Sequence, residues 1–504
     1  MQLDHIAKKV AVAVLTVVLA AGCTGDFEEL NDNPQLVTDS KVQPDVLFTS
    51  VLKRSIFASY EATGGQIGEY SQYYASQSSG NLFNPTDFST PFNWYRQFVI
   101  NLNEILRLAA DDPRKTDERA MARIWKAWVY HIMTDAYGDI PYSEAALGVT
   151  TVINQPKYDG QEAIYTDLLK ELKEAAAELG SQGDQLSFGA ADILYQGNVE
   201  KWKRFANSLR LRLAIRARFA NPTLAATHIG EVISAPLIVE NSQNASLMTL
   251  PPTDTEDASN VNFIYNRLLT ALTPLFVGFA ITDVMTPNND PRMAVFFTPP
   301  ATNPETHRGR PIQLEQQQVE PYQQDMISSV GPILKAETYN IIVLNAAEVA
   351  FLRAEAALAG ITGEDEGQLY LTGIQKSMEQ YGIAASSVTA FLSQEVGQLS
   401  GSDEEKFQQI ITQKFIALFY QGYEAYAEFR RTGYPKVWLG TSTGATDNIP
   451  RRLTYPTAEY LINEKNLSEA IARMGEDTYE TRIWWDVRPG LPFRHPLQGV
   501  FPPN

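Results

Sequence analysis

The sequence predicts a mainly α-helical fold, and three observations lead to this prediction. Apolar residues recur at helical spacing over several long segments, and glycines stand where helices would end, as at Gly360 and Gly382. From about residue 235 to residue 340 the helical spacing breaks down, which divides the chain into helical blocks and one irregular insertion. The segments predicted to be helical are 92–110, 118–137, 161–179, 200–219, 345–360, 366–381 and 403–421.

The chain opens with a leader typical of export. Lys8 and Lys9 precede an apolar run of about a dozen residues, Val10–Ala21, which is too short to span a bilayer as a helix. The run is followed by Gly22 and then by Cys23, the only cysteine of the chain. This pattern resembles a bacterial lipobox, so we expect residues 1–22 to be a signal peptide and Cys23 to be lipidated. The alternative is an ordinary secretory signal followed by a chance cysteine.

A polar segment, residues 23–45, follows the leader and contains Asn33-Pro34. It predicts a lipidated tether that leads into a folded body of residues 46–504.

The predicted helices occur in pairs of roughly 35–45 residues, with alanine, aromatic and glycine punctuation, a period that resembles tetratricopeptide-type helical hairpins. Trp125 and Trp128 in segment 118–137 and Trp202 in segment 200–219 fall at core spacing. We therefore expect these tryptophans to pack in the core rather than to face a ligand.

The segment between about 235 and 340 has the composition of loops. Pro251-Pro252, Pro299-Pro300 and the glutamine-rich stretch 316–324 all break helical spacing. Long loops on a rigid scaffold are where binding sites tend to lie, so this insertion is a candidate ligand-binding region.

Charge and residue usage exclude several classes of protein. The chain carries a formal net charge of −18, which disfavours nucleic acid and anionic membrane surfaces as partners. With Cys23 lipidated, no thiol remains for a disulfide, a metal site or a nucleophile, and the five histidines are scattered. The predicted helix 200–219 carries five arginines that, in so acidic a protein, predict internal salt bridges; they are Arg204, Arg210, Arg212, Arg216 and Arg218.

Motifs for catalysis are weak. One stretch, Gly440–Gly444, fits the nucleophile-elbow pattern G-x-S-x-G, but the residues that follow it predict a loop instead of the required helix. Two carboxylate pairs, Asp135 with Asp139 and Glu424 with Glu428, are close enough in sequence to suggest the acid pair of a glycosidase. We expect these side chains to form helix caps, solvated faces or ion pairs instead.

Eight motifs, in one order along nearly the whole chain, resemble the SusD/RagB family of outer-membrane lipoproteins of Bacteroidetes, and most closely its second SusD-like subgroup. The motifs are FEELNDNP at 27–34, DAYGDIPYSEA at 135–145, WKRFANSLRLR at 202–212, DPR at 290–292, AEVAFLRAEA at 347–356, YEAYAEFRRTGYP at 423–435, IPRRLTYP at 449–456 and WWD at 484–486.

This resemblance implies a single, mainly α domain in which four tetratricopeptide-like helix pairs form a scaffold beside a loop-rich, ligand-binding half. It implies a non-enzymatic nutrient-binding lipoprotein, anchored at the outer cell surface, which binds an oligosaccharide or sometimes a peptide. It also implies action as a hinged lid on a TonB-dependent outer-membrane transporter of the SusC type. The family's shared motifs are mostly structural, so the resemblance transfers no ligand-binding residue.

Residue chemistry alone favours the polar, glycine-containing segment 73–88 as a ligand-binding region, because sugar rings stack on aromatic faces while their hydroxyls pair with amides. The residues predicted to bind ligand are Tyr73, Tyr74, Asn81, Phe83 and Asn84 of this segment, with Tyr322 of the insertion. The alternative is that these side chains merely pack the loops together.

Two other functions stay open at this point. A secreted glycan hydrolase would need a convergent carboxylate pair in an aromatic cleft. A purely structural repeat adaptor would present a large apolar face for a protein partner. The sequence predicts no cofactor, and a structural calcium ion is left open.

Overall fold

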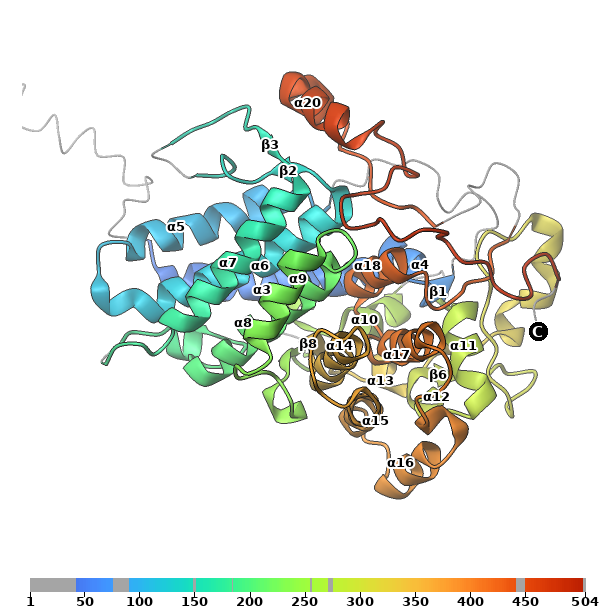
Figure 1. Ribbon diagram of the computed structural model, residues 1–504. Coiled ribbons are helices and arrows are strands. Elements are labelled where there is room, and N and C mark those ends of the chain that lie inside the picture. Colours follow the sequence, from blue (N-terminus) through green and yellow to red (C-terminus); the bar gives the residue numbers. More distant parts are fainter. Residues whose placement is uncertain are drawn as a thin grey trace, which may run out of the picture. The chain divides into compact units, whose positions relative to one another are not determined.

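Helices packed in successive pairs make up most of the computed structural model (Figure 1). The structure describes residues 42–75, 90–147, 151–183, 185–253, 256–270, 275–440 and 449–501. Each helix of a pair contacts its partner, and α8 also contacts α14, which links the first two pairs to the last two. The pairs are α5 (Ile100–Ala109) with α6 (Thr116–Tyr137), α7 (Gln161–Glu178) with α8 (Val199–Ala217), α14 (Ala346–Leu358) with α15 (Glu366–Gln380), and α17 (Asp403–Ala417) with α18 (Gly422–Thr432). This arrangement confirms the predicted fold class.

Local sequence signals set the ends of these helices. The Asn345 side chain accepts a hydrogen bond of 2.8 Å from the backbone N–H of Glu348 and so caps the start of α14. Gly360 and Gly382 follow α14 and α15 with φ values of +68° and +71°, a left-handed conformation that favours glycine. The predicted ends of both helices are therefore confirmed.

The core forms where aromatic side chains of several helices meet. Trp125 and Trp128 of α6 stack with ring centroids 4.5 Å apart, and both are buried, as is Trp202 of α8. The Trp125 indole N–H donates to the Ser55 hydroxyl at 3.0 Å, which satisfies its one polar atom. The predicted core role of these tryptophans is confirmed.

Several helices were not predicted from the sequence. They are α3 (Pro44–Thr63), α4 (Gln66–Tyr70), α9 (Pro222–Val232), α16 (Ala385–Leu392), α18, α19 (Glu459–Ile462) and α20 (Glu464–Met474). The predicted helix 403–421 is also too long, because α17 ends at Ala417 and Tyr420 adopts a φ of +69° before α18 begins at Gly422.

The insertion is built from short elements joined to the rest of the chain by small sheets. Its helices are α10 (Phe263–Thr270), α11 (Phe279–Met285), α12 (Met293–Phe296) and α13 (Pro332–Lys335). An antiparallel pair, β4 (Ala245–Met248) with β8 (Asn340–Leu344), brings the start and the end of the insertion together. A second pair, β2 (Ile140–Pro141) with β3 (Tyr158–Asp159), closes the segment between α6 and α7.

A four-stranded antiparallel sheet joins the start of the predicted ligand segment to the insertion. Its strand order is β1 (Tyr74–Ala75), β5 (Phe276–Val277), β7 (Ser329–Val330) and β6 (Phe297–Thr298). Residues 73–75 are therefore built into the same layer as the insertion, although about 200 residues separate them in sequence.

Residues Asp45 to Asn504 form one compact unit. Among the helices of the described ranges, none combines the length and the apolar character needed to cross a bilayer.

Candidate functional site

Two of the predicted ligand residues, Tyr73 and Tyr74, lie in the core in this structure. The Tyr73 ring stacks on Phe415 of α17 at a centroid distance of 4.8 Å, and its hydroxyl donates to the Phe415 carbonyl at 2.7 Å. Tyr74 packs edge-on against Tyr420, and both predicted residues are at most 2% exposed. Their side chains thus hold β1 against the helices, as in the alternative of loop packing, and their contact with a ligand stays a prediction.

Tyr322 is also buried, at the end of a 3₁₀ turn (Glu320–Tyr322) in the insertion. The Arg308 guanidinium lies 4.6 Å from its ring centroid, and Phe501 meets the ring edge-on at 6.0 Å. Within the described residues, no ring contact or hydrogen bond joins Tyr322 to Tyr73 or Tyr74. The ligand role of Tyr322 also stays a prediction.

The remaining predicted residues, Cys23, Asn81, Phe83 and Asn84, lie outside the residues that the structure describes. The same holds for the nucleophile-elbow pattern beyond Gly440, whose own N–H donates to the Ile312 carbonyl at 3.0 Å.

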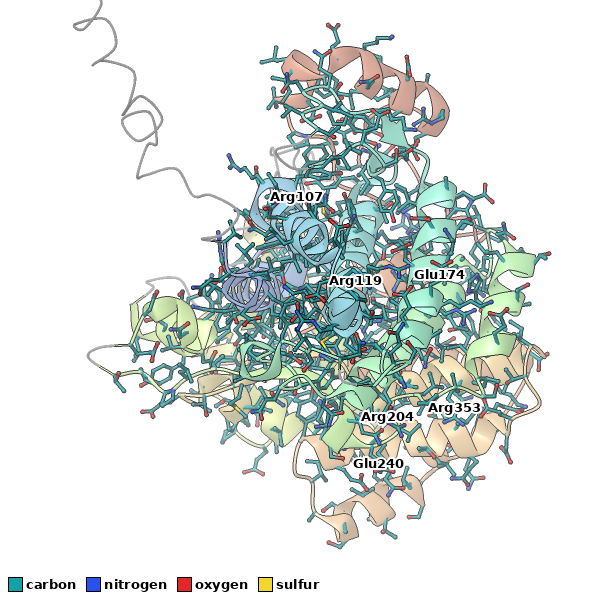
Figure 2. All side chains as sticks on the ribbon, turned by 90° about the vertical axis from the view of Figure 1, so that its left-hand side faces the viewer. Arg107, Arg119, Glu174, Arg204, Glu240 and Arg353 are labelled. Atoms are coloured by element: carbon teal, nitrogen blue, oxygen red, sulfur yellow. The ribbon has the colours of Figure 1, made fainter. Side chains whose placement is uncertain are left out.

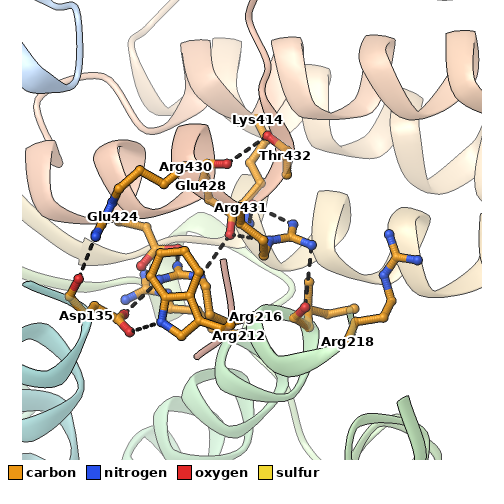
Figure 3. A network of polar contacts seen from close by, with 12 residues as sticks. Asp135, Arg212, Arg216, Arg218, Lys414, Glu424, Glu428, Arg430, Arg431 and Thr432 are labelled. Atoms are coloured by element: carbon orange, nitrogen blue, oxygen red, sulfur yellow. Dashed lines mark hydrogen bonds and ion pairs between the residues drawn. The ribbon is translucent and has the colours of Figure 1, made fainter. Parts of the chain in front are cut away.

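A buried ion network occupies the position where α6, α8 and α18 meet (Figure 3). Its centre is Arg216 of α8, whose guanidinium contacts Asp135 of α6 at 2.7 Å and Glu428 of α18 at 3.1 Å and also pairs with Glu424. The Arg216 side chain has no exposed surface. A buried charge is tolerated only when it is paired and hydrogen-bonded, and Arg216 meets that condition with three carboxylates.

Further cations extend this network along α18. Arg431 pairs with Glu355 of α14 at 2.7 Å and with Glu428 at 2.7 Å, and the Lys414 ammonium of α17 lies 3.0 Å from Glu428. Arg212 of α8 pairs with Glu348 of α14 at 2.6 Å. The predicted salt bridges form at four of the five arginines of α8, namely Arg210, Arg212, Arg216 and Arg218, whereas Arg204 instead donates to the Leu237 carbonyl at 2.7 Å.

The charges of this network shift the carboxyl pKa values in both directions. Burial acts to raise the pKa of Glu424, but Arg212, Arg216 and Lys414 outweigh it and lower the value to about 2. The same cationic surroundings hold the pKa of Glu428 well below its usual range. For Asp135 burial prevails over Arg216, and the pKa is raised.

The carboxylate pairs considered for catalysis thus have structural partners. Asp135, Glu424 and Glu428 belong to the ion network, and Asp139 pairs with Arg473 of α20 at 2.9 Å while it accepts the first backbone N–H of α7 from Gln161 at 2.9 Å. These contacts confirm the prediction of caps and ion pairs.

A small cavity next to this network has a volume of about 30 Å³. Its lining includes Trp128, His131, Tyr420, Tyr423 and Glu424. That volume holds water rather than a sugar residue. Burial lowers the pKa of His131 to about 3, so its imidazole is neutral beside the ion network.

Two larger hollows open at the surface. One, of about 210 Å³, lies between Arg218, Phe219, Phe407 and Arg488. The other, of about 270 Å³, lies against α6 and α7 and includes Lys126, Tyr142 and Asp167. Neither hollow was predicted from the sequence. Tyr142 stands in the motif at 135–145, but Lys126 and Asp167 lie on two different helices, and no sequence pattern relates them to Tyr142.

Solved structures similar to this chain include two described as binding chitin. A chitin-binding protein is 26% identical, with a TM-score of 0.78, over 88% of this chain and 100% of its own. A chitin-binding SusD homolog from Flavobacterium johnsoniae is 27% identical, with a TM-score of 0.73, over 88% of this chain and 98% of its own. A SusD homolog from Bacteroides uniformis is 29% identical, with a TM-score of 0.74, over 89% of this chain and 100% of its own.

Among curated proteins no match to this chain is found. The model of one protein family, described as starch-binding and associating with the outer membrane, matches residues 34–456. This match spans most of the chain, including seven of the eight motifs in whole or in part and all four helix pairs. The chain therefore belongs to the SusD-like_2 family, as its motifs predict.

Proposed function

We propose that this protein is a cell-surface lipoprotein that binds a glycan and acts as the lid of a TonB-dependent outer-membrane transporter of the SusC type. The observation that carries the proposal is the similarity to two chitin-binding proteins, which extends over 88% of this chain and at least 98% of each of theirs. A match along the whole fold supports a shared mode of action more strongly than a match of one module. N-acetylglucosamine oligomers are therefore the first ligands to test.

Binding without hydrolysis is supported by the partners of the carboxylates. Asp135, Glu424 and Glu428 each pair with Arg216 in a buried network, and the adjoining cavity of about 30 Å³ has no room for a sugar ring. A glycosidase needs two carboxyl groups on either side of a scissile bond, within a cleft that admits the sugar. These side chains serve the packing of helices instead.

The proposed main ligand site lies in the loop-rich half, around segment 73–88 and the insertion. Sheet pairing of β1 with β5 supports this placement, because it holds the start of the segment against the insertion. Tyr73, Tyr74 and Tyr322 are buried in this half, and together with Asn81, Phe83 and Asn84 they remain the predicted contacts with the sugar.

The lipobox-like pattern at Cys23 supports attachment to the outer membrane, as does the family description, which names association with the outer membrane. Two or three acyl chains would anchor the protein stably, at roughly 0.8 kcal/mol for each buried methylene. The net charge of −18 makes a direct electrostatic attraction to anionic lipid unfavourable, so the lipid is the proposed anchor.

Calorimetric titration of residues 24–504 with a panel of oligosaccharides tests the proposal. The panel contains N-acetylglucosamine oligomers, maltooligosaccharides, plant and host glycans and a peptide digest. Saturable binding to one glycan class supports the glycan-binding lid. Binding to peptides alone would leave the proposed role as a transporter lid but change the proposed ligand from a glycan to a peptide. Absence of binding to every member of the panel would contradict the proposal.

A further inference from the structure

A groove between α6, α7 and the segment that follows α6 has the chemistry of a sugar-binding site. Its volume is about 270 Å³, slightly below the roughly 300 Å³ at which ligand pockets commonly begin. That size suits one sugar residue rather than a chain. We call it the Lys126 groove and define it by Arg123, Lys126, Tyr142, Ser143, Asp167 and Glu171, which all line it.

One wall of the Lys126 groove is fixed by ion pairs between α6 and α7. Arg123 donates to both oxygens of Glu171, at 2.8 Å and 3.1 Å, and also to Glu174 at 3.0 Å and to Glu178 at 2.9 Å. Glu174 is labelled on α7 in Figure 2. Both the Arg123 guanidinium and the Glu171 carboxylate are therefore held in place and occupied by protein partners.

Lys126, one turn farther along α6, differs from Arg123 in that its charge is not paired with any described residue. Within the part of the chain that the structure describes, its ammonium has neither an ion pair nor a hydrogen bond, and its Nζ lies 5.9 Å from the centroid of the Tyr130 ring. Burial lowers the pKa of Lys126, against the opposing effect of Glu171 and Asp167. This half-buried ammonium can donate up to three hydrogen bonds to a ligand.

The opposite wall offers an acceptor and an aromatic ring. The Tyr142 hydroxyl donates to Oδ2 of Asp167 at 2.7 Å, which leaves Oδ1 of Asp167 without a recorded partner among the described residues. Tyr130 meets the Tyr142 ring edge-on at 4.6 Å and so fixes its orientation. Leu147, 37% exposed, extends the apolar surface at the rim.

The charges of the Lys126 groove balance, because Arg123 and Lys126 face Asp167 and Glu171. A balanced site that offers a free donor, a free acceptor and an aromatic face suits a neutral polyhydroxylated ligand. An anion would meet two carboxylates there, in a protein whose net charge is already −18.

We propose that the Lys126 groove binds one sugar residue of a neutral glycan, at a second site separate from the proposed main site in the loop-rich half. One hydroxyl accepts from the Lys126 ammonium, another donates to Oδ1 of Asp167, and the sugar ring covers Tyr142. The proposal rests on the glycan-binding function proposed above. Two contacts on one chain raise the effective concentration of a long glycan at the protein surface.

Calorimetric titration with the N-acetylglucosamine hexamer tests this proposal in the protein of residues 24–504. We expect two sites per wild-type chain and one site in Lys126→Met, with the affinity of the remaining site unchanged. Lys170→Met is the matched control, because Lys170 is an exposed lysine on α7 that does not line the groove, and it should retain two sites. Thermal unfolding midpoints show whether each variant is folded.

A second measurement needs no variant. Mild acetylation of the wild-type protein followed by peptide mass spectrometry should show that the hexamer protects Lys126 at least fivefold and leaves Lys170 unprotected. The proposal that the Lys126 groove binds sugar would be overturned by a single site per wild-type chain together with equal reactivity of Lys126 with and without the hexamer. The proposed glycan-binding function would not be affected by that result. Absence of any glycan binding by the wild-type protein would overturn both.

Discussion

Arg216 of α8 and Asp135 of α6 form an ion pair of 2.7 Å across a helix interface from which solvent is almost excluded. The other Asp135 oxygen accepts from the Trp485 indole N–H at 2.8 Å and from the Tyr165 hydroxyl. One carboxylate thus satisfies polar groups from three distant parts of the chain. Removal of this group would leave all its partners without compensation.

Replacement of Asp135 by alanine should therefore destabilise the fold strongly. Loss of one member of a buried ion pair costs about 3–5 kcal/mol, since the remaining charge stays buried. Urea unfolding of the soluble protein followed by circular dichroism measures this change. Asp111→Asn, at an exposed position with no ion pair or hydrogen bond to the described residues, is the control and should change the free energy of unfolding by no more than about 0.5 kcal/mol. A loss below 1 kcal/mol for Asp135→Ala would contradict the central role of the network.

The pH dependence of the free energy of unfolding should reveal the stabilising contribution of the Glu424 carboxylate. Its pKa in the folded protein is lowered to about 2, below the value of about 4.3 expected in the unfolded chain. Its stabilising contribution is therefore complete above the unfolded pKa and is lost as the pH falls from about 4 toward 2. Comparison with Glu424→Gln measures this carboxyl together with its effect on Asp135 and Glu348, whose pKa values its charge helps to raise.

We expect the wild-type protein to exceed Glu424→Gln in stability by a constant amount from pH 7 to pH 5, and by progressively less at pH 4 and pH 3. Urea midpoints at these four pH values measure the difference. A difference that grows as the pH falls would have the wrong sign for this account.

The close packing between α14 and α15 predicts that a larger residue at their interface lowers the stability of the fold. A Cβ atom placed on Gly373 of α15 would lie 2.6 Å from the Phe351 ring of α14. Overpacking of a core costs about 1–3 kcal/mol, so Gly373→Ala should lower the thermal midpoint. Gly367→Ala in the same helix meets only a side-chain oxygen of Asp365 at 3.3 Å and should be neutral or slightly stabilising. Equal midpoints for the two variants would show that α14 and α15 pack less closely than described.

Substitution of Cys23 tests the anchor. Cys23→Ser removes the only thiol that the lipobox could acylate, so the protein should leave the outer-membrane fraction and appear in soluble form. Fractionation of cells that express each form, followed by immunoblotting, measures the distribution. Gly22→Ala, which keeps a small residue before the cysteine, should remain in the membrane fraction. Retention of Cys23→Ser in the membrane would point to attachment by some other part of the chain.

The long helices were predictable from the sequence because their apolar spacing extends over many residues. Segments 118–137 and 200–219 match α6 and α8 to within two residues at each end, and Asn345, Gly360 and Gly382 mark helix ends by local chemistry. The break between α17 and α18 was not predictable, because it depends on tertiary packing around Gly422, where a Cβ would meet the Thr63 side chain at 2.7 Å.

The sequence predicted that the charged side chains form ion pairs, but it did not predict which residues pair with which. Acidic composition pointed to internal ion pairs for the arginines of α8, but Arg216 and Glu424 are 208 residues apart, and no local pattern relates them. The ligand residues were harder still. The sequence around a tyrosine in a loop-like segment does not show whether its ring faces solvent or stacks on a helix distant in sequence, as the Tyr73 ring does.

Binding without cleavage is the central claim, and one titration tests it most directly. The soluble protein, residues 24–504, is titrated calorimetrically with the N-acetylglucosamine hexamer, and the sugar is recovered and its chain length measured by mass spectrometry. We expect saturable heat of binding and recovery of intact hexamer. Shortened oligomers after incubation would contradict this expectation by showing catalysis, and an absence of binding heat with this sugar and with every other glycan of the panel would contradict the glycan-binding role itself.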